Sequence, residues 1–152
     1  MSYRKIVVPL DGSELAEEAF REAVPLARAF GAELVLVGVL DLTAGMYDVY
    51  AEAFDPMDLR TQLEKFLRGA LDRALEKVRA EGVEARTMLR VGIPHEEIAA
   101  VAEEEGADLV VMTTHGRKGL SHLLLGSVTE KVIRTAPCPV LVVRPREGSK
   151  ES

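Results

Sequence analysis

Apolar and β-branched residues occur along the chain in short continuous runs that predict strands. Four such runs cover residues 5–10, 33–40, 108–112 and 140–143. The run at residues 5–10 is typical of a strand buried on both faces of a sheet, and the run at residues 108–112 also indicates a buried strand. Residues 85–90 instead alternate between apolar and polar side chains, so we expect a less buried strand at a sheet edge.

Between these runs, apolar residues recur at the spacing of amphipathic helices. The pattern predicts helices over residues 13–30, 57–82 and 94–106, and a last one from near Ser127 to residue 134. We expect Ser13 to cap the first helix and Gly31 to end it. Pro25 lies inside that helix, where a proline ring kinks the backbone.

Strands and helices therefore alternate, which indicates an α/β fold: an open parallel sheet with helices on both faces. A length of 152 residues suits one domain. We expect residues 1–145 to form this domain and residues 146–152 to be a polar tail. Residues 41–56 lack a steady period, so we expect either a lid or a partly ordered connection.

Composition limits the classes of partner. The net charge of −6 argues against nucleic acid and anionic membranes. With 5% aromatic residues and no Trp, platforms for base stacking are not expected. A single cysteine, Cys138, excludes an internal disulfide and a multi-cysteine metal site. No apolar run is long enough to span a membrane, and no signal-peptide pattern precedes the first strand, so we expect a cytoplasmic protein.

Candidate chemistry lies where strands end, because open parallel sheets bind ligands at the carboxyl ends of their strands. After the first strand, Asp11 either accepts hydrogen bonds from a ribose hydroxyl pair or only stabilises the turn and the helix start. The residues alone slightly favour the turn. After the second strand, the backbone of residues 38–41 is a candidate to pair with a base edge, a weak indication because any buried strand would look alike.

The stretch from Thr113 to Ser127 carries the strongest indication of a ligand. It follows a buried strand, and it brings Gly126 and Ser127 to a helix N-terminus, where free N–H groups and the helix dipole favour an anion. Gly116 and Gly119 permit close backbone approach, and Arg117 and Lys118 add cations. The alternative is a flexible loop with a capping serine, but the loop is long and rich in leucine, so we favour phosphate binding.

The histidines and the cysteine are weaker candidates. We expect His95 to lie in the first turn of a helix and His122 at the surface, while His115 lies in the loop, within reach of a phosphate or a partner. Cys138 is expected to be a small buried residue at the start of a strand. No Ser/His/Asp or Cys/His triad can be assembled from these residues.

These residues together resemble the universal stress protein family, in its single-domain nucleotide-binding form, from about Lys5 to Val143. The family loop has the pattern G-x-x-G-x9-G-S/T, which is matched here by Gly116, nine residues, and Gly126-Ser127. Thr113 stands where the family has its first glycine. Further matching segments are IVVPLDGS at residues 6–13, VGIP at 91–94, ADLVVM at 107–112 and APCPVLVV at 136–143.

The resemblance implies the strand order 3-2-1-4-5 and a homodimer that pairs through the strand from Val140 to Val143. It also implies bound ATP, with Asp11 on the ribose hydroxyls, Val39 at the adenine, and Mg²⁺ or Mn²⁺ held through the phosphates. A β-branched Thr113 adds bulk: it weakens binding if the ribose passes over it, and its hydroxyl helps if the ribose lies to one side. The positions that we expect at the nucleotide are Pro9, Leu10, Asp11, Val39, Met112, Thr113, His115, Gly116, Arg117, Gly126, Ser127 and Val128.

Three hypotheses for function follow. The first is an ATP-binding regulatory module that signals through its dimer or a protein partner, favoured because the sequence shows no recognisable general base. The second is a slow ATPase or phosphotransferase, in which a residue such as His115 positions water. The third is a nucleotide-free dimeric interaction protein, for which Thr113 is the main argument.

Overall fold

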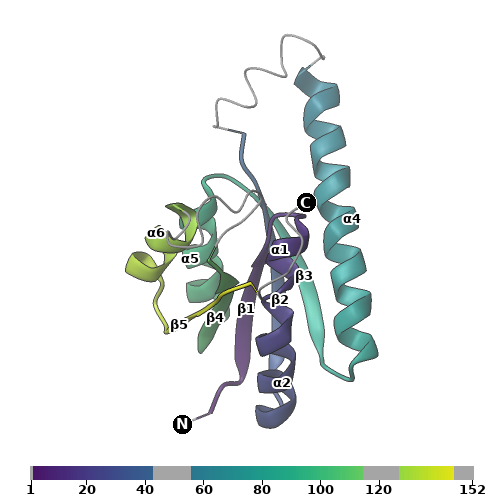
Figure 1. Cartoon of the computed structure of the whole chain (residues 1–152). Helices are drawn as coiled ribbons and strands as arrows, with labels where there is room; N and C mark the ends of the chain where they lie inside the picture. The colour runs from purple at the N-terminus through teal and green to yellow at the C-terminus, as the bar shows by residue number, and fades with distance from the viewer. Residues whose placement is uncertain (1, 43–55, 115–126, 146–152) are drawn as a thin grey trace.

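The computed structural model describes residues 2–42, 56–114 and 127–145, which form a parallel sheet between two layers of helices (Figure 1). The strands are β1 (Lys5–Leu10), β2 (Glu33–Leu40), β3 (Ala85–Val91), β4 (Leu109–Thr113) and β5 (Val140–Val143). They lie in the order β3-β2-β1-β4-β5, and every pairing is parallel. The predicted fold class and strand order are confirmed, as is the edge position of β3.

The helices in these ranges are α1 (Glu14–Glu17), α2 (Phe20–Phe30), α4 (Pro56–Ala80), α5 (Pro94–Glu105) and α6 (Ser127–Thr135). Ser13 caps α1 as predicted, because its Oγ accepts the Ala16 N–H at 3.2 Å. Gly31 ends α2 with a left-handed φ of 66°. None of the described helices is both long and apolar enough to cross a membrane. The expected lid or connection and the expected tail lie largely or wholly outside the described residues.

The prediction of one continuous helix up to residue 30 is wrong, because the helix is interrupted at residues 18 and 19. There the Ala19 N–H donates to the Ala16 carbonyl at 3.2 Å, and the Arg21 N–H to the Glu18 carbonyl at 3.1 Å. These i→i−3 bonds are those of a tighter turn. The break therefore lies before Pro25, whose ring removes the bond that the Arg21 carbonyl would accept.

The central strand β1 divides the core into two layers. Ile6, Val7 and Val8 are all fully buried, and successive side chains of a strand point to opposite faces. Ile6 and Val8 pack with residues of α2 and α4, whereas Val7 packs with residues of α5 and α6. Figure 1 shows these helix pairs on opposite sides of the sheet. Because strands and helices surround β1, only its two ends are open to a ligand.

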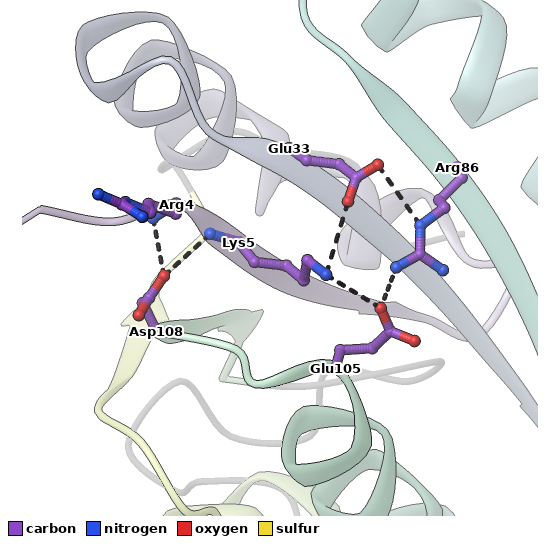
Figure 2. Close-up of polar contacts among 6 residues, drawn as sticks. All are labelled: Arg4, Lys5, Glu33, Arg86, Glu105 and Asp108. Atoms are coloured by element: carbon purple, nitrogen blue, oxygen red, sulfur yellow. Dashed lines mark hydrogen bonds and ion pairs between the residues drawn. The ribbon is translucent and has the colours of Figure 1, made fainter.

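A network of charged side chains joins the amino ends of the strands to the end of α5 (Figure 2). Lys5 at the start of β1 lies 3.4 Å from the Glu105 carboxylate. The Arg86 guanidinium of β3 contacts both Glu105 and Glu33, the latter at 3.4 Å. Nearby, the Asp108 carboxylate accepts the backbone N–H of Lys5 at 3.0 Å. The network therefore ties three strands and a helix together at the edge of the sheet where the strands begin.

The network also offsets an unfavourable helix end. α5 finishes with Glu103, Glu104 and Glu105, and carboxylates at a helix C-terminus oppose the helix dipole. Arg90 on β3 forms an ion pair with Glu104: its Nη2 lies 2.9 Å from the Glu104 carboxylate. The hydrogen bond from Arg86 lowers the pKa of the Glu105 carboxyl, against a smaller opposing effect of burial. The folded state therefore favours the ionised form of Glu105.

Helix α4 lies against the turn that follows β1. Gly12 in this turn has a φ of +89°, a left-handed conformation that disfavours other residues. A Cβ at Gly12 would lie 2.6 Å from Cε2 of Phe66 on α4, and one at Gly38 of β2 would lie 2.9 Å from Cγ of Leu67. Both glycines therefore allow α4 to approach closely, and the Phe66 ring covers the turn that carries Asp11.

We expect Glu105→Gln to lower the free energy of unfolding by about 1 kcal/mol at neutral pH, because the partly exposed ion pairs of the network are weakened. The pKa of Glu105 is lowered from 4.5 on folding, so its contribution is present above that value and is lost as the pH falls through the folded-state pKa. Denaturant titrations at neutral pH and at about pH 3 should show the difference shrinking in acid.

The matched control is Glu103→Gln, a change at an exposed residue in the same helical turn. It should leave stability within about 0.5 kcal/mol of the wild type. An equal cost for both variants at neutral pH, or a cost of Glu105→Gln that does not change with pH, would contradict the role of the network.

We expect Gly12→Ala to lower the free energy of unfolding by roughly 2 kcal/mol or more, because it adds a clash with Phe66 to the strain of a positive φ. Gly82→Ala is the matched control: its φ is +81°, and a Cβ there meets nothing within 4 Å. This control should show the conformational cost alone, about 1 kcal/mol. Phe66→Ala introduced beside Gly12→Ala should recover the difference, whereas equal costs for the two glycines would argue against the packing of the ring on the turn.

Candidate functional site

A cavity lies at the carboxyl ends of the central strands. β1 stands between β2 and β4. The chain runs from β1 to β2 and β3 on one side and then crosses back to β4 and β5 on the other side, so the strand order reverses at β1. This reversal opens a crevice at the strand ends, which is where open α/β sheets bind ligands. The cavity has a volume of about 310 Å³ and is lined by Pro9, Leu10, Asp11, Ala16, Val37, Val39, Pro94, Ile98, Met112, Thr113, Ser127, Val128 and Thr129.

The walls of the cavity are mainly apolar. Val37 and Val39 contribute from β2, Ile98 from α5 and Met112 from β4. All but Val39 are buried in the protein core, and Val39 is half-buried. The last residues of parallel strands all lie at the same end of the sheet. Residues there are therefore part of the core and also form the wall of the cavity. An apolar, partly enclosed space of this size fits a flat organic ring.

Asp11 supplies a carboxylate to the otherwise apolar space. One of its oxygens, Oδ1, accepts the Ser13 N–H at 2.9 Å, so Asp11 does stabilise the turn, as one of the two interpretations predicted. A carboxylate has two oxygens with about four acceptor positions, so this bond leaves capacity for a ligand hydroxyl. Among the described residues that line the cavity, Asp11 has the one acidic side chain.

The start of α6 supplies the polar side of the cavity. Ser127 is the first residue of α6 and is exposed, and Val128 beside it is half-buried. The first backbone N–H groups of a helix have no partner within the helix, and the helix dipole makes this end positive. Thr129 in the same turn is buried, and its Oγ1 donates to the Thr113 carbonyl at 2.9 Å. An anionic group of a ligand would therefore meet favourable electrostatics here.

Thr113 occupies the last position of β4 and is buried, with 6% of its surface exposed. It pairs with Val143 of β5, and the next residue, Thr114, donates its N–H to the Val143 carbonyl at 3.1 Å. The β-branched side chain thus stands on regular strand backbone, which it favours. A glycine is not needed for the backbone conformation at this position.

The structure brings eight of the predicted positions together around the cavity: Pro9, Leu10, Asp11, Val39, Met112, Thr113, Ser127 and Val128. Four others, His115, Gly116, Arg117 and Gly126, lie outside the described residues. The sequence interpretation missed Ala16, Val37, Pro94, Ile98 and Thr129. Ile98 follows the apolar spacing of its helix, but spacing does not say whether an inward side chain meets the core or a cavity.

His95 and Cys138, the weaker candidates among the described residues, do not line this cavity. His95 is in the first turn of α5, as predicted, and His122 lies outside the described residues. Cys138 is half-buried two residues before β5 and is a free thiol. Burial, and to a lesser degree the Asp108 carboxylate, raise the pKa of the Cys138 thiol, which disfavours a reactive thiolate.

A model of the universal stress protein family matches residues 2–144. Universal stress protein MJ0531 of Methanocaldococcus jannaschii is 42% identical over 146 residues, which cover 93% of this chain and 82% of that relative. Universal stress protein YxiE of Bacillus subtilis is 34% identical over 147 residues, which cover 93% of this chain and 99% of the relative.

Solved structures of universal stress proteins are also similar to this chain. Universal stress protein UspA from Lactobacillus plantarum is similar with a TM-score of 0.82 and 28% identity, over 95% of this chain and 99% of that one. A universal stress protein in complex with cAMP has a TM-score of 0.67 and 27% identity, over 95% and 98% of the two chains. One from Archaeoglobus fulgidus in complex with dAMP has a TM-score of 0.64 and 26% identity, over 93% and 98%. With the fold, the cavity and these similarities in agreement, the chain belongs to the universal stress protein family.

Proposed function

We propose that this chain binds ATP in the cavity at the ends of β1 and β4 and acts as a nucleotide-dependent regulatory module in the stress response. The observation that carries the proposal is the meeting of apolar walls, the Asp11 carboxylate and the N-terminus of α6 at one cavity. Similar universal stress proteins in complex with cAMP and dAMP support an adenine nucleotide as the ligand class. In this proposal the protein is cytoplasmic and acts through its dimer or a signalling protein, without contacting nucleic acid.

The base and the sugar are assigned to the apolar part of the cavity. Its volume of about 310 Å³ is at the lower end of small-molecule sites, which span roughly 300–1,000 Å³. The adenine lies against Val37 and Ile98, with the backbone of Val39 at its edge. Asp11 accepts hydrogen bonds from the ribose hydroxyls through the capacity that the turn leaves free. Pro9, Leu10 and Met112 complete the walls.

The phosphates are assigned to the start of α6. Ser127 contributes a hydroxyl, and Ser127 and Val128 contribute N–H groups at the positive end of the helix dipole. Gly116, Gly126, His115 and Arg117 complete the proposed phosphate site. No group of three or more His, Cys, Asp or Glu side chains in the described ranges converges to hold a metal ion, so the proposed Mg²⁺ or Mn²⁺ is held through the phosphates themselves.

Thr113 is compatible with this placement. Its regular pairing in β4 keeps its side chain on an extended strand, and its carbonyl accepts the Thr129 hydroxyl. We therefore place the ribose beside Thr113 and not across its backbone. Hydrolysis of the bound nucleotide and nucleotide-free interaction are the alternatives, and the ligand measurements below distinguish both from ATP binding.

A dimer through β5 is the second part of the proposal. β5 is an edge strand whose described partner is β4 alone, and its Leu141 is 38% exposed. An unpaired strand edge with an exposed apolar residue is a template for pairing with another chain. Two copies that pair through these edges would continue the sheet from one protomer into the other.

We expect calorimetry to show ATP binding to the wild-type protein with Mg²⁺ present, and Val39→Phe to weaken it about tenfold or more, because the larger side chain fills the proposed base site. Val91→Phe is the matched control, since Val91 is 41% exposed on the neighbouring β3 and does not line the cavity. It should leave binding unchanged.

An absence of heat at millimolar ATP, together with no nucleotide released on denaturing the purified protein, would contradict the proposal and favour the nucleotide-free interaction protein. Turnover of ATP that falls in parallel with binding in Val39→Phe would support the slow ATPase. Turnover that is the same in both variants would indicate a contaminating enzyme.

We expect Leu141→Asp to convert the dimer to a monomer, because the change places a charge on the proposed seam. Sedimentation velocity gives the mass directly. Val91→Asp is the matched control, since it places the same charge on an exposed apolar residue of the opposite edge strand. A wild-type monomer, or a dimer that both variants retain, would contradict pairing through β5.

A further inference from the structure

We infer that Thr129 is a positioning residue for the phosphate part of the ligand: its hydroxyl fixes the start of α6 against the end of β4. This inference rests on the proposed nucleotide binding. It concerns a buried hydrogen bond between two segments, and it assigns Thr129 no direct contact with the ligand.

The bond joins two segments of the chain that both line the cavity. Thr129 Oγ1 donates to the Thr113 carbonyl at 2.9 Å, across 16 residues of sequence. Thr129 is 3% exposed and Thr113 is 6% exposed, so water does not compete for the bond. A buried hydrogen bond of this kind is costly to break, because the carbonyl then loses a partner that solvent does not replace.

The position of Thr129 in its helix explains why the hydroxyl bonds to the strand. A helical Ser or Thr often donates to the carbonyl four residues earlier in its own helix. Thr135 does so in α6, with its Oγ1 2.8 Å from the Lys131 carbonyl. Thr129 lies in the first turn of α6, which begins at Ser127, so the described part of this helix has no residue four positions before it. Its hydroxyl bonds to β4 instead.

The strand end that receives this bond is itself fixed. Thr113 pairs with Val143 of β5, and Thr114 donates its N–H to the Val143 carbonyl. On the other side of the bond, Ser127 and Val128 line the cavity immediately before Thr129. The hydrogen bond thus transfers the rigidity of the sheet to the residues whose N–H groups face the proposed phosphates. Anion binding by fixed N–H groups depends on such alignment, because donors already in place need no reordering.

Loss of this hydrogen bond should affect binding of the phosphates and not binding of the base. The apolar wall formed by Val37, Val39 and Ile98 belongs to β2 and α5, which the bond does not touch. Loss of the bond should therefore weaken ligands that carry phosphates more than a ligand that carries none. ATP and adenosine form the matched pair of probes, because they share the base and the sugar.

The test compares Thr129→Val, which keeps the shape and removes the hydroxyl, with Thr135→Val, which removes an exposed hydroxyl bond from the same helix. We expect Thr129→Val to weaken ATP binding about tenfold while adenosine affinity changes by less than about twofold. Thr135→Val should bind both ligands as the wild type does. Calorimetry gives the affinities, and far-UV circular dichroism confirms that each variant is folded.

A second pair keeps the test decisive if the valine disturbs folding. Thr129→Ser retains the hydroxyl and Thr129→Ala does not, so ATP affinity should be near the wild-type value in the first and reduced in the second. If Thr129→Val and Thr129→Ala both bind ATP as tightly as the wild type does, this inference is overturned while the proposed function stands. An equal loss of ATP and adenosine would also overturn it, since that result indicates general disruption. A wild-type protein that binds neither ligand would overturn the proposed function and the inference with it.

Discussion

The burial of β1 on both faces and both edges is the constraint on which the rest of the structure depends. β2 and β4 flank it, α2 and α4 cover one face, and α5 and α6 cover the other. Such a strand has no free side, so a ligand can approach it only at an end. The strand order reverses at β1, so the connections that follow β1 and β4 diverge at the carboxyl end of the sheet. The cavity is therefore a direct consequence of how the core is packed.

The two ends of the sheet have different physical characters. At the amino end, Lys5, Arg86 and Glu105 form a charged network that ties strands to the end of α5 (Figure 2). At the carboxyl end, the described residues form a mostly apolar cavity with few polar side chains. Several ion pairs thus lie together away from the site, whereas single contacts position the elements that form the site. Phe66 on the Gly12 turn and Thr129 on β4 are two such contacts.

Much of the fold was predictable because the relevant physics is local. Apolar β-branched runs are typical of strands, and all four predicted runs became strands, three of them internal and the fourth, β5, at an edge of the sheet. The interrupted first helix was not predictable from spacing, since Ala16, Ala19 and Ala23 keep the helical period through the break. The family resemblance, and not the periodicity, supplied the strand order. The site was predicted in part: the residues at strand ends were found, whereas Ile98 and Thr129 were not.

The sequence by itself determined the elements, the parallel sheet, the positions where strands end and the turn-forming role of Asp11, because each follows from neighbours within a few residues. The tertiary structure alone decided which strand ends meet and which inward side chains line a cavity instead of the core. It also decided that Thr129 bonds to Thr113 across 16 residues, and that Phe66, on the remote α4, covers Gly12. Contacts between residues so distant in sequence depend on the packing of whole layers, and no local pattern of residues encodes them.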